Sequence, residues 1–340
     1  MACYLVVGGL ALVRAGGNPE WFIHFGTQST VIEEGRRILG PHVLIPHVQG
    51  QDGQTFWLMS RDPLLLHPGV EKRYEDRPGY RSQRVLYPLL AAPARLVSER
   101  ALVWALLLVN VGAVGFGTYW TAELAASLRA PKRFCLAFVL CPAVAIGVLM
   151  DASDALALAL VVCGVALWYR TGPRRLLAAS IAFSLAALTK EVTLLVPVAL
   201  VVADLARRRN LGAAVRLAGP PAAAVVGWGL YARARLGWPP SGVQELTWPL
   251  GGFREAYVRG WRPFGDWGQA AIAVGCLILM VIVVATWLRW RTDALLAAVP
   301  FALLFPFLSA QVLDLGVNSA RATGPAVTLI AVSAAAHRWR

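Results

Sequence analysis

A few charged residues stand inside or beside long apolar stretches of this sequence, where charge is costly. Asp52 lies in the stretch QGQDGQTFW, Asp154 follows a long apolar run, and Lys190 with Glu191 interrupts another. Carboxylates can move protons and fixed cations can hold anionic groups, so these residue types fit a catalytic or binding site. The candidates are Asp52, Asp151, Asp154, Lys190, Glu191, Asp314 and Arg321.

Each candidate also has a purely structural interpretation. Asp52 and Asp154 could each cap the helix that follows, because aspartate is a favoured N-cap residue. Arg321 could be an interfacial anchor. A structural reason for interrupting an apolar segment at Lys190 is harder to find. Lys190 is therefore the candidate for which a functional role is favoured most over a structural one.

The elements that position these residues follow from composition. The chain has 340 residues, of which 57% are hydrophobic and 15% are charged. Soluble domains average about 45–50% apolar and about 25% charged residues. The five cysteines are an odd number and stand in apolar runs, which excludes a disulfide scaffold. We therefore predict an all-α polytopic membrane protein that is a single domain over residues 1–340.

Apolar segments of membrane-spanning length recur along the chain. A span needs about 20 apolar residues, with about 17 as the lower limit. Residues 176–206 are interrupted at Lys190, and residues 1–15 are only just long enough. The other candidate spans are 101–128, 134–150, 155–169, 217–232, 269–288, 294–310 and 323–336.

The basic residues in short loops predict the orientation. All clusters share one side only if residues 176–206 form two short helices that meet at Lys190, and this gives about ten spans with both termini cytoplasmic. The net charge of +13 then reflects membrane orientation and not a nucleic-acid partner. The clusters are Arg129/Lys132/Arg133, Arg170/Arg174/Arg175, Arg207–Arg209 with Arg216, Arg289/Arg291 and Arg338/Arg340.

This topology places the candidate residues at the opposite, extracytoplasmic surface. Core spans cover about 101–235 and C-terminal spans about 269–338. The outer loops cover about 17–100, 236–268 and 311–322, and residues 84–97 are expected to form an interfacial helix in the first of them. Because four separate outer turns carry costly charges, we expect them to converge in one site.

Several motifs resemble those of GT-C membrane glycosyltransferases, in particular the bacterial cell-surface glycopolymer type. They extend over nearly the whole chain in the order that this family has. The matching stretches are GNPEWFIHFG (17–26), QDGQTFW (51–57), YRSQRVLYPLLA (80–91), LMDASDALALAL (149–160), LAALTKEVTLLVP (185–197) and NSARATGP (318–325).

The resemblance implies inverting transfer of a hexose or pentose from a polyprenyl-phosphate donor to an extracytoplasmic glycan, lipid or protein. Asp52 matches the acid of the family's first loop and would be the general base. Lys190, and second Arg321, would bind the donor phosphate. A divalent cation held by Asp52 and Asp154 is an open alternative, and no other cofactor is implied. The supporting or substrate-binding residues would be Asp151, Asp154, Glu191, Gln54 and Arg84.

Two other classes of protein also fit a polytopic chain. A transporter or lipid-linked-sugar flippase is expected to have inverted repeats and charges near the membrane midplane. A non-catalytic subunit of an envelope-assembly complex would allow Asp52 and Lys190 to lie more than about 15 Å apart, whereas catalytic groups must meet at one reacting centre. We therefore expect Asp52 and Lys190 to lie close together if the protein is a glycosyltransferase, and this distinguishes it from a non-catalytic subunit.

Overall fold

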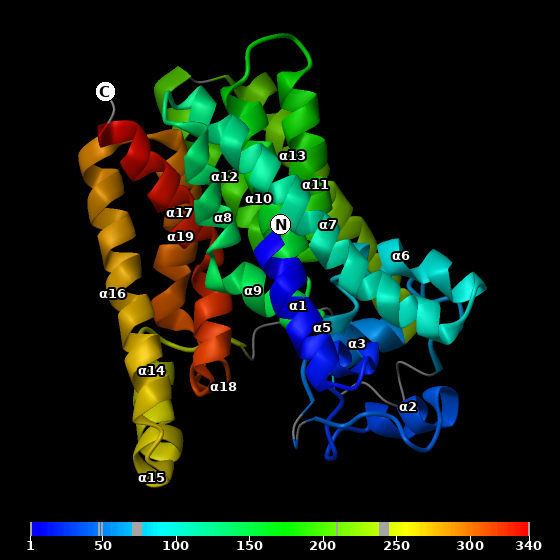
Figure 1. Ribbon diagram of the computed structural model, residues 1–340. Helices are drawn as coiled ribbons and strands as arrows, with labels where there is room; N and C mark the ends of the chain where they lie inside the picture. The colour runs from blue at the N-terminus through cyan, green and yellow to red at the C-terminus, as the bar shows by residue number, and fades with distance from the viewer. Residues whose placement is uncertain are drawn as a thin grey trace.

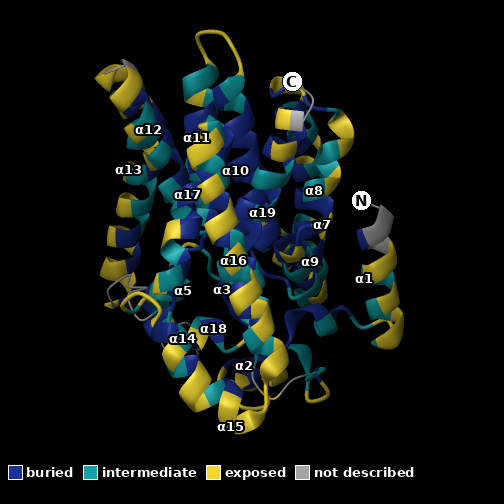
Figure 2. Ribbon diagram, turned by 90° about the vertical axis from the view of Figure 1, so that its left-hand side faces the viewer, coloured by how far each residue is buried: buried dark blue, intermediate teal, exposed yellow. Residues whose placement is uncertain are grey.

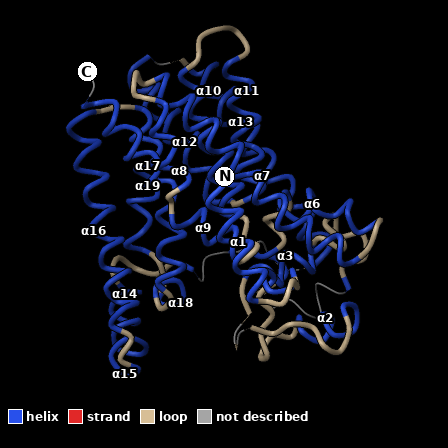
Figure 3. Tube along the Cα trace, viewed as in Figure 1, coloured by secondary structure: helices blue, strands red, loops and turns tan. Residues whose placement is uncertain are grey.

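The fold is helical throughout. The computed structural model of the chain describes residues 2–46, 48, 50–69, 77–208, 210–237 and 245–338. In these ranges there is no β-strand, only one isolated antiparallel bridge between Leu246 and Leu308 (Figure 3). The predicted all-α class is therefore confirmed.

Two described helices are long and apolar enough to cross a membrane: α7 (Glu99–Ser127) and α16 (Trp267–Trp290). Lys132–Val139 and Pro142–Leu149 pass the same test only as one bent pair. Length and composition thus support two or three of the predicted spans. Shorter apolar helices are α10 (Asp154–Tyr169), α11 (Arg175–Thr189) and α17 (Asp293–Leu304).

The predicted span over residues 134–150 is broken. Helices η3 (Lys132–Cys135) and α8 (Leu136–Val139) are followed by α9 (Pro142–Leu149), with a bend of 52°. Pro142 has no backbone N–H to continue a helix and forces the residue before it into an extended conformation. Cys141 has this conformation, with φ −68° and ψ 123°.

The predicted break at Lys190 is confirmed. Lys190 is extended between α11 and η4 (Glu191–Leu194), and α12 (Leu195–Arg208) follows. The Lys190 side chain contacts Asp154 at the start of α10, so α11 returns to that end of the bundle. Arg207 at the end of α12 pairs with Asp293, which also accepts a hydrogen bond from Trp168 at the far end of α10. The two half-helices therefore run in opposite directions.

The basic clusters gather at one end of the bundle, as predicted. Glu123 at the end of α7 pairs with Lys132 (3.3 Å) and with Arg170 (3.1 Å), which belong to two different clusters. The connections between α10 and α11 and between α16 and α17 lie at this same end, at the top of Figure 1. We call it the basic end. Arg209 and Arg340 lie outside the described residues.

Helix α10 is the central element of the bundle. It packs between α7 and α11, and every residue of it except Leu167 and Tyr169 is buried. In contrast, α13 (Leu211–Leu236) and α16 have exposed stripes along their length (Figure 2). The first residue of α10 is Asp154, so this carboxylate is fixed to the most enclosed helix.

The first predicted outer loop consists of short helices at the end opposite the basic end. The expected helix over residues 84–97 is two elements that divide next to Pro93, because proline has no backbone N–H with which to continue an α-helix. Arg84 precedes both. The helix α1 (Ala2–Arg14) precedes this loop and covers the predicted short first span over residues 1–15. The elements of the loop are η1 (Pro19–Ile23), α2 (Val31–Leu39), α3 (Asp52–Met59), α5 (Pro78–Arg81), α6 (Leu86–Ala91) and η2 (Ala92–Leu96).

The other two predicted outer loops are also largely helical. The last one contains α18 (Ala310–Leu313) and the start of α19 (Gly316–Arg338), so Arg321 stands on a helix and not in a loop. In Figure 1, α14 and α15 continue below α16. The remaining elements are α14 (Gly251–Ala256), the π-helix η6 (Tyr257–Trp261), α15 (Arg262–Phe264) and η7 (Phe305–Phe307).

Candidate functional site

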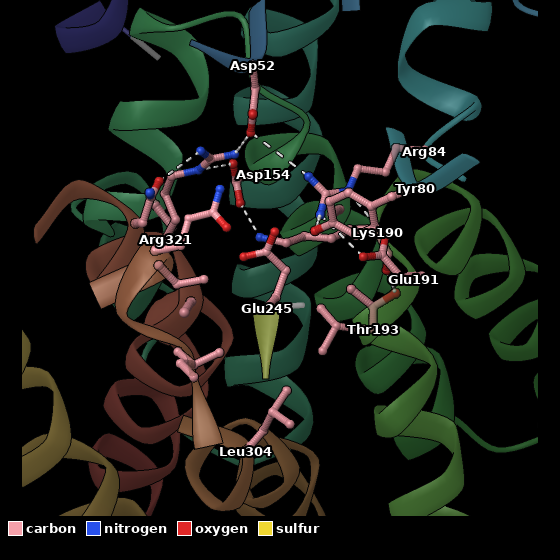
Figure 4. A pocket seen from close by; sticks show the side chains of 18 of the residues that line it. Asp52, Tyr80, Arg84, Asp154, Lys190, Glu191, Thr193, Glu245, Leu304 and Arg321 are labelled. Atoms are coloured by element: carbon pink, nitrogen blue, oxygen red, sulfur yellow. Dashed lines mark hydrogen bonds and ion pairs between the residues drawn. The ribbon is translucent and has the colours of Figure 1, made fainter. Parts of the chain in front are cut away.

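A cavity of 590 Å³ opens at the end of the bundle opposite the basic end. Its walls come from distant parts of the chain: the start of α3, α5, the start of α10, the break after α11, the end of α17 and the first turns of α19 (Figure 4). Asp52 and Lys190 both line it. Five of the seven candidates therefore converge here, namely Asp52, Asp154, Lys190, Glu191 and Arg321, whereas Asp151 and Asp314 do not line the cavity.

An unbroken chain of ion pairs joins the main candidates. Arg321 donates from Nε to Asp154 Oδ2 (2.7 Å) and from Nη2 to Asp52 Oδ2. Lys190 Nζ donates to the other oxygen of Asp154, at 2.5 Å. Asp52, Arg321, Asp154 and Lys190 thus form a single network (Figure 4), although they are up to 269 positions apart in the sequence.

A second group of partners lies beside this network. Arg81 donates to Asp52 Oδ1 at 2.8 Å, and Arg84 Nη1 lies 3.9 Å from Asp52 Oδ2. Arg84 also makes two hydrogen bonds of 3.2 Å to Glu191 and one of 2.5 Å to the hydroxyl of Tyr80. Arg84 and Glu191, both expected to support the site, therefore lie in its wall.

Close backbone packing positions Asp52 at the start of α3. The N–H of Gln51 donates to the carbonyl of His24 (3.1 Å), and the His24 ring contacts the carbonyl of Leu149 (2.9 Å). This contact ties the loop to the end of α9. Asp52 is the first helical residue and Gln51 is the N-cap, so capping alone does not account for Asp52.

Replacing Gly53 with alanine is expected to lower the melting temperature. A Cβ atom here would lie 2.6 Å from the carbonyl oxygen of Met150 and 2.7 Å from that of Ile23, so backbone must move. Overpacking of this kind costs roughly 1–3 kcal/mol. Thermal unfolding in detergent would measure it.

Gly112→Ala is the matched control, because nothing lies within 4 Å of the added atom. Gly112 is inside α7, where alanine is favoured over glycine by about 1 kcal/mol, so a neutral or stabilising effect is expected. If both variants melted alike, the close packing around Gly53 would not be what holds Asp52 in place.

The charges in the cavity nearly balance. Five cations and four carboxylates among its described lining residues leave one net positive charge. The cations are Arg77, Arg81, Arg84, Lys190 and Arg321, and the carboxylates are Asp52, Asp154, Glu191 and Glu245. Burial would raise the pKa of Asp52, but the guanidinium groups of Arg321, Arg81 and Arg84 outweigh it and hold the pKa well below its ordinary value. Asp52 is therefore ionised in this arrangement.

One side of the cavity wall is largely apolar. The end of α17, η7 and the segment up to α19 contribute most of the apolar lining residues beside the charged network. A ligand with an anionic group and a hydrocarbon chain can satisfy both halves of the cavity at once. The apolar residues of these elements are Phe301, Leu304, Phe305, Leu308, Val312 and Leu315.

Asp151 does not belong to the cavity, contrary to the expectation that it supports the site. Its side chain is fully buried in the protein interior and is not part of the lining. The residue has a positive φ of 43°, a conformation that aspartate tolerates in tight turns. The turn between α9 and α10 therefore directs Asp154 into the cavity and Asp151 away from it.

Gln54 lines the cavity as expected, and its side-chain oxygen accepts a hydrogen bond from the N–H of Gly26 (3.4 Å). Four charged or phenolic lining residues were not predicted from the sequence: Arg77, Tyr80, Arg81 and Glu245. The stretch YRSQR contains two of them and was already part of a quoted motif. Nothing local marks Glu245, because its partner Arg77 is 168 positions away.

The two aspartates do not fit a divalent metal. The guanidinium group of Arg321 bridges Asp52 and Asp154 and takes the position between the carboxylates that a shared metal ion would need. Across the described ranges, no cluster of three or more His, Cys, Asp or Glu side chains could hold a metal ion. No step of the chemistry below is therefore assigned to a metal.

Comparison of the chain with protein-family models, with curated proteins and with solved structures found no match. The case for a function therefore rests on the geometry of the cavity.

Proposed function

We propose that the protein is a multi-span membrane glycosyltransferase of the GT-C type. It would transfer a sugar, with inversion, from a polyprenyl-phosphate donor to an extracytoplasmic glycan, lipid or protein. The observation that carries this proposal is the network of Asp52, Arg321, Asp154 and Lys190 in one cavity with an apolar wall. A potential base and two phosphate-binding cations are thereby present at one centre.

The membrane arrangement is part of the proposal. The basic end would face the cytoplasm, following the bias of Lys and Arg in short loops, and the cavity would open at the extracytoplasmic surface. The short helices on either side of Lys190 would cross as part of a bundle of about ten spans, because protein and not lipid covers their ends. The apolar wall of the cavity would take the polyprenyl chain.

The reaction would be a single displacement at the anomeric carbon. The acceptor oxygen forms a bond to that carbon while the bond to the phosphate oxygen breaks, and the bonding electrons stay with the phosphate. The acceptor proton passes to Asp52. Lys190 and Arg321 would stabilise the phosphate, whose charge grows as the bond breaks, and this favours the transition state over the ground state.

Two features favour a transferase over the other classes. The charged residues lie at helix ends on one side of the bundle, whereas a transporter is expected to hold them near the middle of its spans. Asp52 and Lys190 belong to one network, in which Arg321 and Asp154 connect them. A non-catalytic subunit has no need to bring these two residues close together.

The direct test is incubation of the purified protein with a panel of polyprenyl-phosphate sugars and candidate acceptors. Release of lipid phosphate together with a glycosylated product is the expected result. Arabinose, mannose and glucose donors would all be included. Absence of lipid phosphate release with every donor would contradict the proposal.

A further inference from the structure

We propose that Asp52 occupies the place on Arg321 that the donor phosphate takes when it binds. The donor must then displace this carboxylate before the acceptor can be deprotonated. The inference rests on the proposed function and deepens it, because it makes binding of the lipid phosphate the event that frees the base.

All three nitrogens of the Arg321 guanidinium group are engaged. Nε donates to Asp154 (2.7 Å), Nη1 to Asn318 Oδ1 (3.3 Å) and Nη2 to Asp52. The group has five N–H donors, so one remains on each of Nη1 and Nη2, but a phosphate oxygen that binds where one of these acceptors lies must replace it. The side chain is also only 10% exposed, which leaves little room for approach from another direction.

Of the two carboxylates on Arg321, Asp52 is the one that can give way. Its side chain is 15% exposed, whereas that of Asp154 is 3% exposed and is also held by Lys190. A phosphate that replaced Asp52 on Nη2 would leave the bond from Nε to Asp154 intact. It would also lie beside Lys190, because Lys190 and Arg321 bind opposite oxygens of Asp154.

The displacement has a chemical consequence for Asp52. Among the cations that lower its pKa, Arg321 has the largest effect. With Arg321 transferred to the phosphate, the carboxylate keeps Arg81 and becomes a stronger proton acceptor. Asp52 would thus be a weak base while it is paired with Arg321 and a stronger one once the donor has displaced it.

The test measures binding of sugar-free polyprenyl phosphate to the full chain in lipid nanodiscs. Asp52→Asn removes the competing carboxylate and is expected to bind the lipid about tenfold more tightly than wild type. Glu245→Gln is the matched control, since it removes one carboxylate from the same cavity but one that pairs with Arg77. Its affinity is expected to stay within about twofold of wild type.

Each outcome decides between the alternatives. Equal tightening by both variants would mean that only net charge matters, and unchanged affinity in Asp52→Asn would mean that no competition exists; either result overturns the inference. If no form of the protein binds the lipid, the phosphate site itself is wrong. If the affinities follow the expected order but no donor sugar is ever transferred, the proposed function fails while the competition stands.

Asp52→Asn leaves excess positive charge in a buried site and can lose stability. If it melts too early for titration, its melting temperature is measured against polyprenyl phosphate concentration, since a ligand of the folded state stabilises it. A larger rise than in wild type supports the competition, and an equal or smaller rise contradicts it.

Discussion

Asp52→Asn is expected to abolish sugar transfer while the protein still inserts into membranes and purifies normally. An amide cannot take the proton of the acceptor hydroxyl, and general base catalysis contributes about 10²–10⁴-fold in rate. The cavity keeps its shape in other respects, because asparagine has the size of aspartate and its oxygen can still accept a hydrogen bond from Arg81. The measurement is the initial rate of lipid phosphate release at saturating donor and acceptor.

The control for this prediction is again Glu245→Gln, which changes the cavity charge equally but leaves the proposed base in place. In a single turnover it is expected to transfer sugar at close to the wild-type rate, because the base is still present. Retained turnover in Asp52→Asn would remove Asp52 as the base. The same substitution, Asp52→Asn, is therefore expected to strengthen the binding of polyprenyl phosphate and to abolish sugar transfer.

Lys190→Ala is expected to impair use of the donor. Its ammonium group lies 2.5 Å from Asp154 and next to the position that we assign to the phosphate. Loss of one partner of an enclosed charge pair costs about 2–5 kcal/mol, which corresponds to a rise of roughly 30-fold or more in the donor KM. The measurement is donor saturation at fixed acceptor concentration.

Two further variants separate this effect from a loss of fold or of general charge. Lys132→Ala removes a lysine at the basic end whose side chain is 67% exposed, and unchanged donor kinetics are expected. Lys190→Arg keeps the positive charge and should retain part of the donor binding, although its planar group differs from a point charge. Unaltered donor kinetics in Lys190→Ala would assign the phosphate to other residues.

The sequence was sufficient to predict those features that follow from the free-energy cost of placing a charge in an apolar segment. Charge inside an apolar segment is expensive wherever it stands, so the break at Lys190 and the gathering of candidates at one end could be inferred without coordinates. The same reasoning placed the basic clusters together, and the ion pairs of Glu123 with Lys132 and Arg170 bear this out.

Features that depend on the direction of a side chain or on long-range pairing could not be predicted in this way. Asp151 and Asp154 have equivalent surroundings in the sequence, and only the turn between them decides which one enters the cavity. Arg77 and Glu245 each look like ordinary loop charges, and their meeting requires the whole fold. The predicted number of about ten membrane spans is also not confirmed by the helix lengths. Among the described residues, only two or three helices are long and apolar enough to cross a membrane.

The single unit of excess positive charge in the cavity has a consequence for turnover. The proposed donor, a polyprenyl-phosphate sugar, carries one negative charge, so the loaded site would be electroneutral. After transfer, the lipid phosphate carries close to two negative charges and Asp52 holds the proton, and the sum is still zero. Only when that proton escapes to water does the site become negative overall. Deprotonation would then expel the spent lipid, and each catalytic cycle would end with a coupled departure of proton and product.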